Sequence, residues 1–198
     1  ESLFKKSLMF LSQKEVHILI VGASGSGKSE TINALLKDAN IDLDAQGSNI
    51  LEIGNALKSA SKKGTGNVGF PEFVGIVKDF IIVIENKAET SKHVKLDENN
   101  LISLESKDVV NYALNGALFY GQHLAKNTSY KKVIAIAVSG NDKKHRITPL
   151  FVDETEYYRE LPDVESFISF NDKNIVEYYT REVLKEETAK EKETAEIL

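Results

Sequence analysis

The chain alternates short apolar runs with polar and glycine-containing segments. Its clearest runs have the length of strands and are apolar at nearly every position, which is typical of strands buried on both faces of a sheet. They are residues 15–21, 73–77, 80–85, 133–138 and 147–152. Only Lys78-Asp79 separates the second run from the third, so these two runs are predicted to form a hairpin.

Other segments are predicted as helices, and the clearest of them, residues 108–125, repeats apolar residues at helical spacing. The predicted helices are residues 2–12, 28–38, 49–61, 108–125 and 174–195. The face of residues 108–125 that includes Tyr120 is expected to pack in the core. Residues 62–69 are glycine-rich and are predicted as a loop. Strands alternate with helices, so we predict an α/β fold with a mixed central sheet flanked by helices.

The length and composition suit one globular domain. Of the 198 residues, 41% are hydrophobic, which is enough to build a core. We expect a single domain over residues 1–198, in which residues 174–198 form a charged, solvated helix that connects to a further domain. No apolar run reaches membrane-spanning length and no signal peptide is apparent, so we expect a cytoplasmic protein with no membrane partner. The absence of cysteine excludes disulfides and thiolate zinc sites.

The net charge of the chain limits how it can bind nucleic acid. The formal net charge is −5 and the pI is near 5.5, whereas a domain that grips nucleic acid by itself is usually basic. This argues against tight autonomous DNA binding, but not against an enzyme to which other domains deliver the DNA. Lysines do gather locally, at Lys58, Lys62 and Lys63 and again within residues 143–146.

The candidate chemistry lies at the predicted hairpin. Glu72 directly precedes its first strand, and Glu85 and Lys87 end its second. Residues two apart on a strand point to the same face, so Glu85 and Lys87 share a face, and Glu72 on the adjacent strand can join them. Two carboxylates can hold a hard divalent cation, and a neighbouring ammonium can position water or stabilise charge on a phosphate. We therefore predict metal-dependent phosphodiester hydrolysis, with Glu72 and Glu85 as metal ligands and Glu72, Glu85 and Lys87 as catalytic residues.

This arrangement resembles a known superfamily. Pro71-Glu72 followed by Glu85-Asn86-Lys87 is similar to the two motif elements of the PD-(D/E)xK nucleases. From about residue 40 to 198, the chain also resembles the nuclease domain at the N-terminus of type I restriction R subunits and of fused restriction nuclease–methyltransferases. The segments that support the resemblance are residues 64–93, 108–124 and 131–153.

The resemblance implies a restriction-endonuclease-like fold and a DNA endonuclease that uses Mg²⁺ or Mn²⁺ within a restriction-modification enzyme. Its partners would be DNA and methyltransferase or specificity domains or subunits. Related nucleases take a carboxylate from a helix before the first motif, which implies that Glu52 is an additional metal ligand. The alternative for Glu52 is a helix-capping pair with Asn49. One departure is Glu72, because the family often has Asp at that position and the longer side chain can place the metal differently.

A second motif competes with the nuclease motif. Residues 22–29 match G-x-x-x-x-G-K-[ST] between a predicted strand and a predicted helix, and residues 15–37 resemble the first phosphate-binding motif of GTPase-like domains. Its nucleotide-binding residues would be Gly22, Gly27, Lys28 and Ser29. The alternative function is therefore a nucleotide-binding switch domain, and ATP would enter only through this loop or through separate motor domains. No convincing partner motif follows, and the origin of residues 1–37 stays open.

Overall fold

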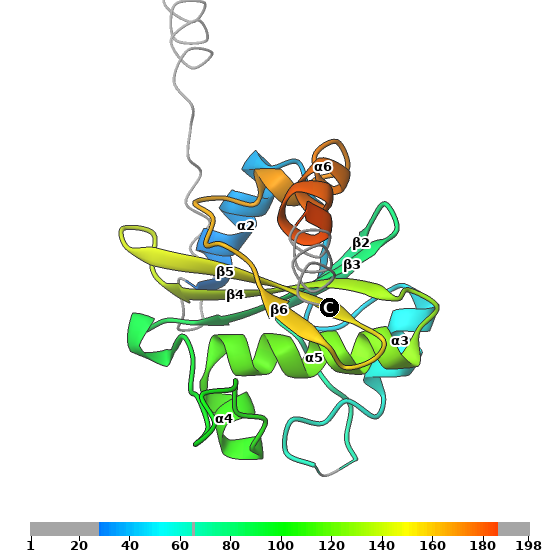
Figure 1. The fold of residues 1–198 in the computed structure, drawn as a ribbon, viewed down its shortest axis with the longest axis vertical. Helices are drawn as coiled ribbons and strands as arrows, with labels where there is room; N and C mark the ends of the chain where they lie inside the picture. The colour runs from blue at the N-terminus through cyan, green and yellow to red at the C-terminus, as the bar shows by residue number, and fades with distance from the viewer. Residues whose placement is uncertain (1–27, 65, 186–198) are drawn as a thin grey trace, which may run out of the picture.

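The computed structural model describes residues 28–64 and 66–185. At its centre lies a six-stranded sheet with the order β1-β2-β3-β4-β5-β6 (Figure 1). The strands are β1 (Asp44–Ala45), β2 (Phe73–Val77), β3 (Phe80–Lys87), β4 (Lys132–Gly140), β5 (His145–Asp153) and β6 (Tyr158–Glu160). The strands predicted within this part of the chain are confirmed. The edge strands β1 and β6 were not predicted, because they are too short to show an apolar pattern.

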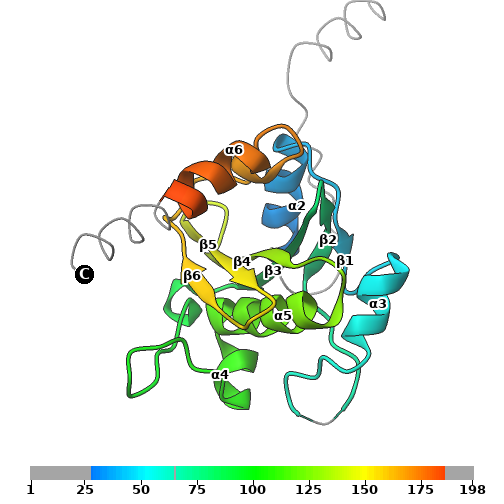
Figure 2. The same ribbon diagram turned by 45° about the vertical axis from the view of Figure 1, so that its right-hand side comes forward.

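The sheet is mixed, as the alternation of elements predicted. Neighbouring strands pair antiparallel except β3 and β4, which run parallel. Parallel strands require a long crossover connection, and this one contains α4 (Ser106–Asn111) and α5 (Ala113–Asn127). Figure 2 shows α5 lying along the sheet beneath β3 and β4. The α/β class is therefore confirmed.

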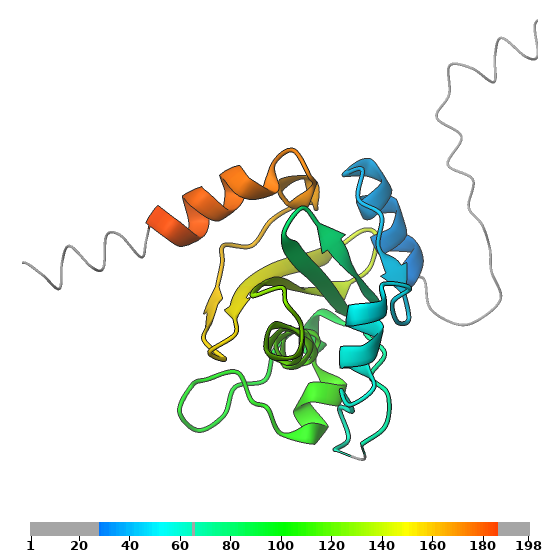
Figure 3. The same ribbon diagram turned by 90° about the vertical axis from the view of Figure 1, so that its right-hand side faces the viewer.

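Different helices cover the two faces of the sheet (Figure 3). On one face, α5 and α3 (Leu51–Leu57) pack against buried residues such as Ile81 and Val83 of β3. On the other face, α2 (Lys28–Asp38) and α6 (Ile175–Tyr179) pack against Ile82 and Ile84. We call the first of these the α5 face. Because both faces are buried, the strands read as continuous apolar runs rather than as an alternation.

The helix predicted over residues 108–125 is in fact two helices. Tyr112 separates α4 from α5 with an extended backbone, at φ −120° and ψ 141°. The break leaves the first amides of α5 available, and the N–H of Leu114 donates to the carbonyl of His93 at 2.8 Å. The side chain of Asn115, also in the first turn, bonds to both backbone groups of Lys95. These contacts with the crossover segment separate the helices, although the apolar spacing continues across the break.

The C-terminal segment was predicted as a solvated connector helix, and its described part is different. Here α6 is followed by a π-helical turn, η3 (Thr180–Leu184), and Ile175, Tyr178 and Val183 are buried in the core beside α2. The segment to Leu184 therefore packs against the domain through these three apolar residues. The sequence predicted a solvated helix because most of the residues between them are charged or polar. The remaining short helices are η1 (Thr90–Lys92) and η2 (Ile168–Phe170).

The helix predicted over residues 28–38 is confirmed as α2, and Ile32 and Leu36 are buried in the same core as β2 and β3. The helix α2 thus packs in the same core as the central sheet. The helix predicted over residues 49–61 is shorter and ends at Leu57. No helix in the described part of the chain combines the length and the apolar character that a membrane span requires.

Candidate active site

Glu85 lies near the end of β3, on the α5 face, and is almost completely buried. It follows Ile81 and Val83 at two-residue intervals, so its side chain points toward α5. Only 1% of the residue is exposed. A buried carboxylate costs free energy unless it is paired with a positive group or binds a cation. The groups around Glu85 therefore show how its charge is stabilised.

The carboxylate fits against the first turn of α5 because residue 116 is glycine. A Cβ atom on Gly116 would lie 3.3 Å from both Cγ and Oε2 of Glu85, and 3.0 Å from the carbonyl oxygen of Val109. Since α5 begins at Ala113, the carboxylate lies beside the positive end of the helix dipole. This end of α5 favours negative charge on Glu85 or on an anion bound next to it.

The two oxygens of Glu85 have different surroundings. The ammonium nitrogen of Lys62 lies 2.5 Å from Oε2, and the two side chains are 17% and 2% exposed. Oε1 is buried and has no hydrogen-bond partner within the described residues. Burial raises the pKa of Glu85, an effect that the ammonium groups of Lys62 and Lys87 oppose and the charge of Glu72 reinforces. The unsatisfied oxygen is therefore available to a further ligand.

Glu72 lies opposite Glu85. The antiparallel register pairs Phe73 with Ile84, and its continuation by one residue places Glu72 across from Glu85. Glu72 also alternates with Val74, which belongs to the α5 face. The electrostatic effect of Glu72 on the pKa of Glu85 agrees with this placement. The two predicted metal ligands thus share one face of the hairpin.

Gln46 holds Glu72 in place, and Lys87 lies beside Glu85. Gln46, which follows β1, donates its backbone N–H to the carbonyl of Glu72 and its side-chain amide to Oε2, both at 3.1 Å. Lys87 is half-buried at the end of β3, on the same face as Glu85, and lowers the pKa of that carboxyl. The structure therefore brings Glu72, Glu85 and Lys87 together. Their catalytic roles stay a prediction.

Tyr120 of α5 forms another wall of this site. Its hydroxyl oxygen accepts a hydrogen bond from the backbone N–H of Phe70 at 2.9 Å, and the Lys62 nitrogen lies 4.8 Å from the ring centroid. Burial raises the pKa of Tyr120, and the charges of Glu85 and Glu72 raise it further. The hydroxyl therefore stays protonated and keeps a proton that it can donate.

Glu52 does not join the site. Its carboxylate accepts hydrogen bonds from the backbone N–H of Ser129 at 2.5 Å and from the Ser129 hydroxyl at 3.1 Å. Ser129 follows the C-terminal end of α5, whereas Glu85 lies beside its first turn, roughly 20 Å away at the rise of an α-helix. The capping pair with Asn49 is also absent, because Asn49 bonds to Asp44 instead. Glu52 therefore connects α3 to the end of α5.

The donor set at Glu72 and Glu85 fits a hard divalent cation that keeps most of its water. Within the described ranges, no group of three or more His, Cys, Asp or Glu side chains converges. Two carboxylates, one of them with an unsatisfied buried oxygen, match the preference of Mg²⁺ for a few oxygen ligands and several waters. A closed protein cage of the kind that holds structural zinc does not fit this arrangement.

The competing phosphate-loop motif falls largely outside the described residues. Gly22 and Gly27 lie outside the described residues. Lys28 and Ser29 begin α2, and only their backbone is described. The nucleotide-binding interpretation therefore stays a prediction. Glu85, the acidic strand end that a nucleotide site would need, points to the face of the sheet opposite α2.

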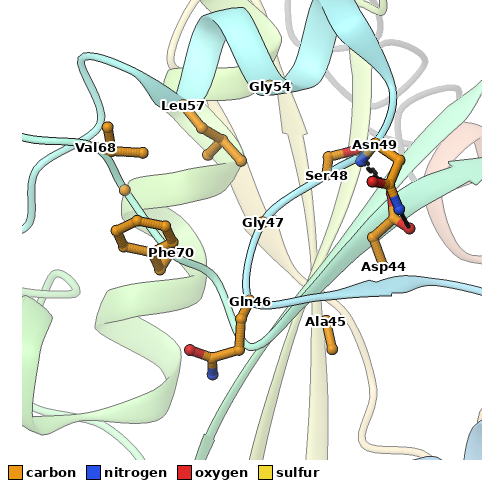
Figure 4. A pocket seen from close by; sticks show the side chains of 11 residues that line it. Asp44, Ala45, Gln46, Gly47, Ser48, Asn49, Gly54, Leu57, Val68 and Phe70 are labelled. Carbon is orange, nitrogen blue, oxygen red and sulfur yellow. Dashed lines mark hydrogen bonds between the residues drawn. The ribbon is translucent and has the colours of Figure 1, made fainter.

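A cavity of about 340 Å³ lies next to Glu72, between β1, α3 and the segment that leads into β2 (Figure 4). Asp44 lines it, with a pKa held low mainly by hydrogen bonds from Asn49. Phe70 and Val68 line the opposite side and are 58% and 45% exposed. Gln46 also lines the cavity and bonds to Glu72, so the cavity adjoins the carboxylate pair.

A buried polar network lies beyond the end of β3 on the α5 face. Nδ1 of His93 is 2.7 Å from the Ser139 hydroxyl, and Nε2 is 2.8 Å from the Thr148 hydroxyl. Thr148 also bonds to Asp163, which accepts a hydrogen bond from Arg146 at 2.6 Å. Burial lowers the pKa of His93 to about 4; Arg146 adds to this effect and Asp163 opposes it. The neutral imidazole thus fixes the segment that follows β3.

Comparison with known proteins gives the site a context. No family model and no solved structure matches the chain. The chain is 35% identical over 170 residues to the type II restriction enzyme and methyltransferase RM.BcgI of Heyndrickxia coagulans. The chain is a relative of a restriction enzyme. The match covers 85% of this chain and 26% of the relative, so the chain spans about a quarter of that enzyme's length.

The relationship supports the predicted resemblance to restriction nucleases, whereas the PD-(D/E)xK assignment, the type I relationship and the restriction-endonuclease-like fold stay predictions. Three residues at the site were not predicted to belong to it: Lys62, Gln46 and Gly116. All three reach Glu72 or Glu85 from distant parts of the chain. Only Lys62 had a signal in the sequence, as one member of a lysine cluster next to a glycine-rich loop.

Proposed function

We propose that this chain is the nuclease part of a restriction-modification enzyme and that it hydrolyses phosphodiester bonds of DNA with Mg²⁺. The observation that supports the proposal best is the pair formed by Glu72 and Glu85, which face each other across β2 and β3 with Lys87 on the same face. The similarity to a restriction enzyme and methyltransferase supports the biological context.

The residues of the site have separate tasks in this reaction. Glu72 and Glu85 would hold the cation, which when bound polarises the phosphate and acidifies a water molecule. Lys87 orients the attacking water or stabilises the negative charge that develops on the phosphate oxygens. The oxygen of water forms a bond to phosphorus while the bond to the leaving sugar oxygen breaks. The water gives up one proton, and the leaving oxygen takes one.

DNA would be delivered by other parts of the enzyme. The net charge of −5 disfavours tight binding of DNA by this chain alone. The chain corresponds to about a quarter of its relative, which is named as both a restriction enzyme and a methyltransferase. We therefore propose methyltransferase and specificity domains or subunits as its partners, with recognition of the DNA sequence located there.

The test is cleavage of plasmid DNA by the full-length enzyme in Mg²⁺ or Mn²⁺. Glu85→Ala should abolish nicking and linearisation, Glu85→Asp should retain a small fraction, and Glu72→Ala and Lys87→Ala should lose at least about 100-fold in rate. Asp79→Ala is the matched control. Asp79 lies in the turn of the same hairpin and is exposed, with a surface contact to Lys132 at 3.4 Å.

The Asp79 variant should cut at the native rate, because exposed ion pairs contribute little to stability. A variant with Glu72, Glu85 and Lys87 all replaced by Ala that still cut DNA would exclude this site as the nuclease centre. Thermal unfolding of each variant separates loss of chemistry from loss of fold.

A further inference from the structure

Lys62 differs from the other lysines in its cluster. Lys58 bonds to Asn55 on the surface of α3 and Lys63 is exposed, whereas the side chain of Lys62 turns inward and is 17% exposed. Its ammonium nitrogen lies 2.5 Å from Oε2 of Glu85, so it contacts a carboxylate that the proposed reaction needs. One lysine of the three therefore belongs to the site.

The backbone on either side fixes this position. Ala60 is fully buried, and the N–H of Gly69 donates to the carbonyl of Leu57 at 2.7 Å. A Cβ atom on Gly69 would lie 2.2 Å from the carbonyl oxygen of Ala60 and 2.8 Å from the Tyr120 ring, so Gly69 passes in close contact with both. The segment that includes Lys62 thus leaves and rejoins the fold at neighbouring points beside Tyr120.

The charges of the site balance only when Lys62 is counted. Glu72 and Glu85 contribute two negative charges, and Lys62 and Lys87 contribute two positive ones. A divalent cation would make the site doubly positive, which matches the two negative charges of a phosphodiester at the transition state of hydrolysis. Lys62 and a cation can also bind different oxygens of Glu85. Lys62 pairs with Oε2, whereas Oε1 has no described partner.

We propose that Lys62 is a second lysine of the active site with two successive partners. Before the cation binds, Lys62 neutralises Glu85, which would otherwise be a buried unpaired charge. When the cation and DNA are bound, the ammonium of Lys62 donates to a non-bridging oxygen of the scissile phosphate. This inference rests on the proposed nuclease function.

The test uses the full-length enzyme with Lys62→Met, and Lys63→Met as the matched control. Binding of Mn²⁺ alone is measured by calorimetry without DNA, and cleavage is measured at saturating Mg²⁺. Lys62→Met should bind Mn²⁺ about tenfold more tightly, because a competing positive charge is lost. The same variant should cut about 100-fold more slowly, because a donor to the phosphate is lost. Lys63→Met should match the native enzyme in both measurements.

The two opposite changes distinguish this role from a structural one, which would weaken both properties. Should Lys62→Met fail to fold, Lys62→Gln removes the same charge and should show the same pair of changes. Unchanged or weaker Mn²⁺ binding, or cleavage at the native rate, would overturn the assignment of Lys62. Glu85→Ala in the same assay separates the two proposals: if it is inactive, the nuclease proposal stands whatever Lys62 does, and if it cuts, the nuclease proposal itself fails.

Discussion

Gly116 of α5 lies against Glu85 of β3 so closely that a methyl group at residue 116 would touch the carboxylate at 3.3 Å. The absence of a side chain there leaves the space in which Glu85 is buried. Contacts of this length can be accommodated only if the carboxylate moves by a few tenths of an ångström. Gly116 is therefore a condition for the position of Glu85.

We expect Gly116→Ala to weaken Mn²⁺ binding and slow cleavage by about tenfold or more, because metal sites and active sites tolerate little displacement. The effect on stability should be small, since alanine gains about 1 kcal/mol in helix propensity and loses a similar amount in the tight contact. Gly121→Ala on the same helix is the control. It meets Ala135 and Val152 at similar distances, away from Glu85, and should leave Mn²⁺ binding unchanged.

The ion pair between Lys62 and Glu85 should stabilise the metal-free chain. Lys62→Met leaves the buried carboxylate unpaired and should lower the free energy of unfolding by about 3 kcal/mol. Adding Glu85→Gln to this variant should restore part of the loss, because the neutral amide is less costly to bury than the charge. Urea unfolding in the presence of a chelator measures this. Additive effects of the two substitutions would show that the pair is not coupled.

The stability of the chain should fall in mild acid because of His93. Burial lowers the pKa of His93 to about 4 in the folded chain, below its ordinary value of 6.5. The unfolded chain therefore takes up this proton first as the pH falls, and stability is lost between about pH 6.5 and 4, by up to roughly 3 kcal/mol. Urea unfolding at pH 7, 5.5 and 4.5 should show a shallower decline for His93→Gln. Equal slopes for the two proteins would contradict this origin.

Glu52 should matter for stability and not for chemistry. Its bonds to Ser129 join α3 to the turn after α5, so Glu52→Ala should cost about 1 kcal/mol. Cleavage and Mn²⁺ binding by the full-length enzyme should be unchanged. A loss of Mn²⁺ affinity with the fold intact would restore Glu52 as a metal ligand, as its place before the first motif had suggested.

The phosphate-loop motif should bind nucleotide weakly or not at all. A nucleotide site at this motif needs a carboxylate at the end of a later strand to bind Mg²⁺, and Glu85 is the best candidate. Glu85 faces Glu72 on the α5 face, however, and not α2. Calorimetry of the chain with ATP and with GTP in Mg²⁺ should therefore detect no micromolar binding and no hydrolysis. Micromolar binding that is lost in Lys28→Ala would make the nucleotide-switch hypothesis the leading one.

The hairpin was predictable because its information is local. The runs 73–77 and 80–85 are apolar throughout, and the turn between them is short, so alternation alone places Glu85 and Lys87 on one face. The contact between Lys62 and Glu85 was not predictable, because it depends on where Ala60 and Gly69 meet Tyr120 in the folded chain. The same holds for Glu52, whose partner Ser129 is distant in sequence and follows another helix.

The turn at Lys78-Asp79 has a consequence for the spacing of the carboxylates. It joins Val77 directly to its partner Phe80, and Lys78 has a left-handed backbone with φ 57°. Glu72 lies about 20 Å from this turn along β2, at the rise of an extended strand. Inserting or deleting a single residue in the turn would shift the pairing of the strands and carry Glu72 out of line with Glu85. The length of this surface turn therefore sets the position of Glu72 relative to Glu85. A change in the turn alone would abolish cleavage by an enzyme whose active-site residues are all intact.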